Sequence, residues 1–185
     1  GGYGSDFFSA GYRVQDRNTL ISLRKRETLS ASLDFTGRVF LGEYLYTGQY
    51  PLTGVPLNHD RSLGQWWGGE ALWDYVGWQG HRVVGGVEFQ RNQRQDQFNY
   101  DTTMLMASRR DGYRLGVFVQ DEITLSPQTA LTLGLRHDQA DGLSAQWNPR
   151  LGLVYRPEAT RTFKFNYSSA FRAANVYERY YNSGQ

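Results

Sequence analysis

The sequence contains no cysteine, and only 5 of its 185 residues are proline. The lack of cysteine excludes a disulfide-stabilised fold and any metal site built on thiolates. No apolar run approaches the roughly 20 residues that a membrane-spanning helix requires. The first residues, Gly1-Gly2-Tyr3-Gly4, have neither the charged nor the apolar region of a signal peptide. These absences exclude a helical membrane protein.

The composition separates the remaining classes only in part. A mean hydropathy of −0.60 is typical of a soluble protein, but a membrane β-barrel gives the same average because every second residue lines a wet interior. A net charge of +2 is too small to indicate a nucleic-acid partner. Aromatic residues make up 15% of the chain and glycine accounts for 21 residues, which favours long strands with aromatic residues at membrane interfaces.

Apolar and polar residues alternate with a period of two along several stretches, as in a strand with two different faces. The clearest stretches are 113–124 and 131–136, and 163–167 follows the same rule. We predict that the apolar members of the two later stretches face lipid: Leu131, Leu133, Leu135, Phe163, Phe165 and Tyr167. In 113–124 the apolar members are Tyr113, Leu115, Val117, Val119 and Ile123. Several strands run to ten or more residues, which suits a tilted membrane crossing of about 9–11.

The expected connections alternate between short and long. Short turns are expected near residues 36, 78, 127 and 158, with longer loops at about 48–64, 95–111 and 138–149. This order is typical of a membrane barrel with short periplasmic turns and long outer loops. The sequence therefore predicts an all-β fold: a transmembrane antiparallel β-barrel portion of about 8–9 up-and-down strands, in which residues 6–15 are one candidate strand. Placing Glu43 inward would put Phe40, Tyr44 and Tyr46 on the lipid side.

Four motifs, in order along the chain, resemble those of TonB-dependent outer-membrane receptors. They are residues 116–122 (GVFVQDE), 131–138 (LTLGLRHD), 148–157 (NPRLGLVYRP) and 169–178 (SAFRAANVYE). Ala174 stands where the family usually has proline. Upstream, the stretches 60–61 (DR), 66–70 (WWGGE) and 86–89 (GVEF) also match the middle of that family's barrel.

The resemblance implies that residues 1–185 are part of the β-barrel domain of such a receptor, in the bacterial outer membrane. The family's barrel has about 22 strands and a plugged lumen, so a fragment without its plug domain is expected. The implied function is TonB-energised uptake of a scarce solute, such as an iron-siderophore, haem, cobalamin or a carbohydrate. The expected partners are outer-membrane lipid, lipopolysaccharide, a metal chelate, and the TonB complex acting through the absent plug segment.

Two groups of residues are candidates for a functional site. The first is the polar face of the strands, which is expected to form the lumen wall: Gln120, Glu122, Arg136, Asp138, Lys164 and Asn166. These side chains either hold the plug and guide substrate or only keep the lumen wet, as inward polar residues do by default. The second group comprises possible ligand contacts at the outer rim: Arg172, Asn175, Tyr177, Glu178, Tyr180, Tyr181 and Tyr100. The same rim residues would alternatively brace the rim or touch the plug.

Other chemistries find little support in the sequence, and no catalytic residue, metal site or cofactor is expected. His59, His81 and His137 lie far apart, and a triad of His137 with Ser168 or Ser169 lacks a nucleophile elbow. Two groups of basic residues, the pair at 109–110 and the run at 24–26, have two possible roles. They either are charged residues exposed to solvent in loops or bind an anionic ligand or lipopolysaccharide. The alternatives to a receptor are a passive porin-like channel and an outer-membrane hydrolase, the second of which needs an inward Ser–His pair.

Overall fold

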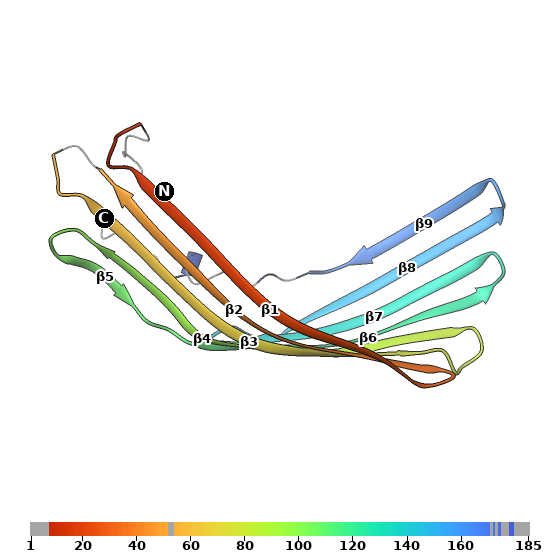
Figure 1. Cartoon of the computed structure of the whole chain (residues 1–185). Coiled ribbons are helices and arrows are strands. Elements are labelled where there is room, and N and C mark those ends of the chain that lie inside the picture. The colour runs from red at the N-terminus through yellow and green to blue at the C-terminus, as the bar shows by residue number, and fades with distance from the viewer. Residues whose placement is uncertain (1–7, 52–53, 171, 173, 175–177, 180–185) are drawn as a thin grey trace.

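The chain forms a single curved antiparallel sheet of nine strands in the computed structural model, which describes residues 8–51, 54–170, 172, 174, 178 and 179 (Figure 1). The strands are β1 (Arg13–Ser30), β2 (Leu33–Tyr50), β3 (Asn58–Tyr75), β4 (His81–Tyr100), β5 (Met104–Ser108), β6 (Gly112–Ser126), β7 (Thr129–Ala140), β8 (Gln146–Glu158) and β9 (Arg161–Ser168). Sequential neighbours pair throughout, except that β4 pairs with both β5 and β6. The expected all-β antiparallel fold is confirmed.

The short and long connections lie at opposite ends of the sheet, as expected. The turns at 31–32, 76–80, 127–128 and 159–160 gather at the right of Figure 1, which we call the short-turn end. The longer connections lie at the other end, which we call the long-loop end, and β1 to β4 reach well beyond the later strands there. In membrane barrels the short turns face the periplasm, so the long-loop end is the outer one.

The predicted turn at Thr36 and Gly37 is wrong, because both residues lie inside β2. The first hairpin closes five residues earlier, where Ser30 pairs with Leu33 across a two-residue turn. A two-residue turn alone would shift the alternation by one residue, but β1 has an extra residue between Thr28 and Ser30, so that Thr28 pairs with Asp34. The two shifts cancel, and the alternation in the sequence continues through the hairpin without a visible break. Gly37 has a different role: a Cβ there would lie 3.2 Å from the ring of Phe35, which packs over the glycine.

The strands extend further towards the long-loop end than the sequence predicted. β3 begins at Asn58 rather than near 65, and the polar stretch 95–111 holds the end of β4 and the whole of β5. β1 covers residues 13–30 instead of 6–15. These segments are polar on both faces because they extend past the lipid, where both faces meet water. Without an apolar face they have no strand-like alternation, so the sequence predicted a loop there.

The register separates the side chains into two faces. Arg38, Glu70, Glu88, Gly116 and Asp138 are aligned across five neighbouring strands and point to one side. Ser169, Ala170 and Arg172, which follow β9, line a hollow together with Glu70, Glu88, Gly116 and Asp138. The residues of this row therefore lie on the inside of the curved sheet, which we call the concave face (Figure 1). The other side of the sheet is the convex face.

The faces of β2 resolve the ambiguity at Glu43. Phe40 lines the concave hollow together with Glu70, so Tyr44 and Tyr46 share its side and Glu43 points to the convex one. There Glu43 accepts hydrogen bonds from Arg17 at 3.3 Å and Gln65 at 2.9 Å. The placement of Glu43 inward is therefore wrong, and Glu43 marks the outer limit of the apolar part of β2.

The convex face is apolar and exposed. Leu133 is 45% exposed, Val119 51% and Phe165 57%, and by register all the residues predicted to face lipid lie on this side. Among the described residues, Tyr50 is the only large hydrophobic side chain that is buried, so the sheet has no hydrophobic core of its own. No helix within the described ranges has the length and apolar character needed to cross a membrane. A sheet that buries so little apolar surface against itself needs lipid against its convex face.

Replacing Leu133 with arginine should destabilise the protein by up to about 2–4 kcal/mol, since the charge would enter the hydrocarbon layer. The free energy of unfolding in lipid vesicles, from denaturant titration of the complete protein, measures this cost. The matched control is Thr132→Arg, on the concave face opposite Glu122, which should be nearly neutral. Equal losses at the two positions would contradict the assignment of faces.

Candidate functional site

The six residues expected to form the lumen wall all lie on the concave face. The register places Gln120 and Glu122 of β6, Arg136 and Asp138 of β7, and Lys164 and Asn166 of β9 on the same side as Glu88. Gln120 donates a hydrogen bond to Glu122 at 3.2 Å and accepts one from Arg150 at 3.2 Å. Their exposure to a lumen in a closed barrel stays a prediction.

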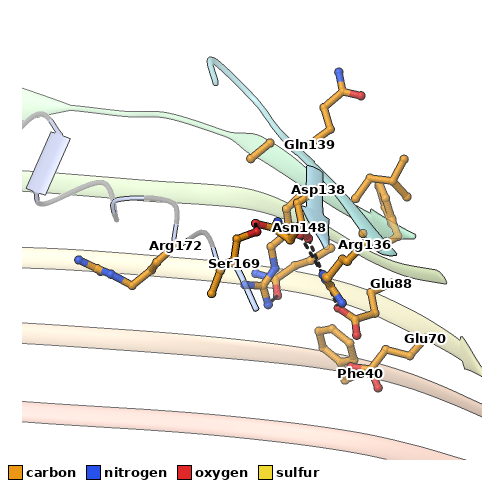
Figure 2. Close-up of a pocket in the computed structure, with 16 residues that line it drawn as sticks. Phe40, Glu70, Glu88, Arg136, Asp138, Gln139, Asn148, Ser169 and Arg172 are labelled. Carbon is orange, nitrogen blue, oxygen red and sulfur yellow. Dashed lines mark hydrogen bonds and ion pairs between the residues drawn. The ribbon is translucent and has the colours of Figure 1, made fainter. Parts of the chain in front are cut away.

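Arg136 is the centre of the best-connected cluster on this face (Figure 2). Its Nε donates to both oxygens of Asp138, at 2.8 and 2.9 Å, and its Nη2 donates to Glu88 at 2.8 Å. Between Arg136 and Glu88 lies Gly116, where a Cβ would overlap the guanidinium nitrogen. The absence of a side chain at Gly116 is therefore what allows Arg136 to reach across β6 to a strand two positions away.

A second guanidinium pairs with the same row of residues from the other side. Glu70 and Glu88 are direct cross-strand neighbours, an arrangement of like charges that destabilises a sheet if it is left uncompensated. Arg38 compensates Glu70, with its Nε 2.9 Å from Oε2, and Arg136 compensates Glu88. The middle of the wall is thus a chain of charges in which each of the two neighbouring carboxylates is paired with its own guanidinium.

Sequence reasoning did not single out Arg38, Glu70 or Glu88 as site residues. Their alternation within each strand was visible, but the chain of charges depends on which residues face each other across strands. That register becomes known only once the turns are placed, and the first turn was misplaced.

A hollow of about 480 Å³ lies over this chain of charges. Figure 2 shows its lining, which includes Phe40, Glu88 and Arg136 from the sheet and Ser169 and Arg172 from the segment after β9. Ser169 donates to Asn148 at 3.4 Å, and its backbone N–H donates to the carbonyl of Pro149 at 3.1 Å. These bonds hold the start of the segment against β8.

A second hollow, of about 530 Å³, lies nearer the long-loop end. Four arginines contribute to its lining: Arg109, Arg110, Arg114 and Arg179. Arg114 donates to the neutral side chain of Gln90 at 2.7 Å, so within the described part of the chain no carboxylate offsets its charge. Arg109 lies over the ring of Phe98, 5.6 Å from its centre. We call this hollow the arginine hollow; it contains the predicted basic pair at 109–110.

Tyrosines cover the concave face beyond the arginine hollow. Tyr50 is 2% exposed and its hydroxyl is hydrogen-bonded to that of Tyr46, while its ring meets Tyr12 edge to face at 5.6 Å. Burial, assisted by the bond to Tyr46, raises the pKa of the Tyr50 hydroxyl. Gly48 leaves the space that this ring occupies. The outer end of the concave face is therefore a rigid aromatic wall with polar edges.

The predicted rim residues divide into three groups. Asn175, Tyr177, Tyr180 and Tyr181 lie outside the described residues. Arg172 and Glu178 form an ion pair at 3.0 Å, and Arg172 lines the first hollow. Tyr100 stacks on His59 at 5.0 Å and does not line either hollow. A role of these residues in binding stays a prediction.

The remaining basic run is distant from the outer rim. Arg24 to Arg26 lie within β1 near the short-turn end, where Arg26 pairs with Asp34 at 2.6 Å. These residues thus lie at the opposite end of the sheet from the outer rim, where a ligand arriving from outside would bind.

Catalytic and metal chemistry gain no support from the geometry. His137 lies on the convex face, where its ring is tilted against that of Trp147 with the centres 4.4 Å apart, whereas Ser168 lies on the concave face. The Ser–His pair that a hydrolase needs is therefore not formed by these two residues. Within the described ranges no three residues of the histidine, cysteine, aspartate and glutamate types gather closely enough to hold a metal ion.

Comparison with known proteins identifies a family. The family model described as "TonB dependent receptor-like, beta-barrel" matches residues 1–185. A ferric enterobactin receptor from Pseudomonas aeruginosa is 37% identical over 62 residues, which are 34% of this chain and 8% of that protein.

Solved structures show the same fold. The ferric preacinetobactin receptor of Acinetobacter baumannii superposes with a TM-score of 0.63 at 13% identity, over 83% of this chain and 30% of that one. A mutant of the ferric enterobactin receptor of Pseudomonas aeruginosa gives a TM-score of 0.52 at 14% identity, over 94% of this chain and 36% of that one. The chain thus spans about a third of the length of these receptors.

The two-faced curved sheet and the family match over residues 1–185 agree with each other. The predictions of an outer-membrane location and of a non-enzymatic protein are confirmed by this family. The chain belongs to the TonB-dependent receptors and forms part of their outer-membrane β-barrel.

Proposed function

We propose that the chain is part of the wall of a receptor that imports a ferric siderophore across the outer membrane, driven through TonB. The ligand would first meet the outer end of the concave face. The observation that carries this proposal is the arginine hollow, which lies at that end and has Arg110, Arg114 and Arg179 in its lining.

The chemistry of the arginine hollow favours an anion. A ferric chelate becomes an anion when its deprotonated oxygen ligands outnumber the three positive charges of the metal. Arginine binds such oxygens through a planar fork of donors. Arg114 suits this task best, because its present partner is a neutral amide and its charge is not offset by a carboxylate among the described residues.

The aromatic wall supports the same proposal. Tyr46 lies on the same concave face, towards the long-loop end of β2, and is half-buried. A polar-tipped aromatic side chain of this kind suits first contact with a polar ligand. Two relatives are named as receptors for ferric enterobactin and ferric preacinetobactin. Those names make a ferric chelate the preferred class over haem, cobalamin or a carbohydrate.

The middle of the wall would have a different role. The charges of Glu70, Glu88 and Asp138 are already paired with Arg38 and Arg136, so this part of the wall offers little net charge to a passing ligand. We assign it to seating the plug and keeping the lumen wet.

Replacing Arg114 with glutamine in the complete receptor should weaken binding of its ferric siderophore about tenfold or more, because a charge-assisted hydrogen bond is lost. Equilibrium binding to cells, normalised to surface expression, measures the change. The control is Arg61→Gln, which removes the same charge from the convex side of β3 and should leave affinity unchanged. Normal affinity of the Arg114 variant at normal expression would exclude the arginine hollow as the binding site.

Energy coupling is tested separately from binding. Uptake of radioactive iron as the ferric siderophore should stop in cells that lack TonB, while surface binding should persist. A passive porin-like channel would instead continue to transport at a rate proportional to the external concentration. Uptake that is unaffected by loss of TonB would overturn the proposed mechanism and leave the binding result untouched.

A further inference from the structure

A carboxylate and an imidazole are hydrogen-bonded to each other among the apolar side chains of the convex face. Asp121 is flanked along β6 by Val119 and Ile123 and opposed across the sheet by Val83 and Leu133. Its Oδ2 is 2.7 Å from Nδ1 of His81. A carboxylate among lipid-facing side chains is costly unless it is compensated, so its presence there requires an explanation.

His81 compensates this carboxylate only in part. An ionised carboxylate has roughly four lone-pair sites, and His81 fills one of them. Oδ1 is covered by protein and has no hydrogen-bond partner in the described part of the chain. The Asp121 side chain is nevertheless 26% exposed, so a group in the membrane can reach the edge of the carboxylate beside His81.

Aromatic residues fix the depth of the pair in the membrane. Trp78, in the β3–β4 turn, meets the ring of His81 edge to face at 6.4 Å and that of Tyr75 at 5.3 Å. Exposed tryptophan and tyrosine at the end of a membrane strand mark the level of the lipid head groups. This turn belongs to the short-turn end, which faces the periplasm. His81 therefore lies at the level of the lipid head groups on the periplasmic side. Asp121 lies slightly deeper in the membrane, because it is further from the turn.

We propose that Asp121 and His81 form a binding site for the primary ammonium head group of a phospholipid in the periplasmic leaflet. A primary ammonium supplies both things that the carboxylate lacks, a positive charge and N–H donors. It approaches from the membrane along the exposed edge of Asp121, while Trp78 flanks it with an aromatic ring, a surface that attracts cations. The proposal depends on the outer-membrane location and not on which solute the receptor binds.

The test is native mass spectrometry of the complete receptor titrated with three dioleoyl phospholipids. Phosphatidylethanolamine has a primary ammonium, phosphatidylcholine a quaternary one without N–H donors, and phosphatidylglycerol no cation. The ethanolamine lipid should bind about tenfold more tightly than either of the others, the amount expected of one charge-assisted hydrogen bond. Equal binding of the three lipids by the unaltered receptor would overturn the proposal.

Asp121→Asn should abolish this preference. The matched control is Glu122→Gln, which removes a carboxylate from the next residue of β6 but on the concave face, and which should keep the preference. Loss of the preference in both variants, or in neither, would contradict a site at Asp121. A purely structural latch between β4 and β6 would lower thermal stability in Asp121→Asn without changing the preference for the ethanolamine lipid.

A second variant covers the case in which Asp121→Asn does not fold. Val83 lies directly opposite Asp121, so Val83→Lys retains the carboxylate and places a competing ammonium beside it. The preference for phosphatidylethanolamine should then be lost as well. A folded Val83→Lys receptor that keeps the full preference would show that the lipid binds elsewhere.

Discussion

The structure depends on one constraint: in a membrane every backbone N–H and C=O must be hydrogen-bonded within the protein. The chain meets it with eight strands that pair side by side in one antiparallel sheet, from β1 to β4 and on through β6 to β9, while β5 pairs with the outer end of β4. Because neighbouring residues of a strand point to opposite sides, this register also decides which side chains meet lipid and which meet each other. The apolar convex face, the paired charges of the concave face and the hydrogen-bonded pair of His81 and Asp121 all follow from it.

The register gives particular meaning to small residues. Gly116 lies in the row that joins Glu88 to Asp138, and the space it leaves is filled by the guanidinium of Arg136. Gly48 similarly makes room for the ring of Tyr50. In both cases a missing side chain on one strand allows a large side chain to lie across it, so the wall is held together by contacts over more than one strand spacing.

Sequence patterns predicted what is local and failed for what is not. The alternation along 113–136 correctly assigned the faces of β6 and β7, because the period of two is set by the backbone of each strand alone. The turn at 31–32 was missed because the extra residue between Thr28 and Ser30 cancels the one-residue shift that the turn introduces, so the period of two continues. The apolar alternation of β6 did not account for Asp121, whose pairing with His81 joins residues 40 positions apart. Arg136 and Asp138 were named, but their link to Glu88 depends on a register that one sequence does not contain.

The central claim is that alternate residues of one strand face lipid and water. The chain has no cysteine, so single cysteines can be introduced along residues 113–124 of β6 and labelled in the intact membrane with a water-soluble maleimide. The account predicts labelling that alternates along the strand: fast at the concave positions such as Arg114, Gln120 and Glu122, and slow at the convex positions such as Leu115, Val117 and Val119. Labelling that changes smoothly along the strand, without a period of two, would contradict it.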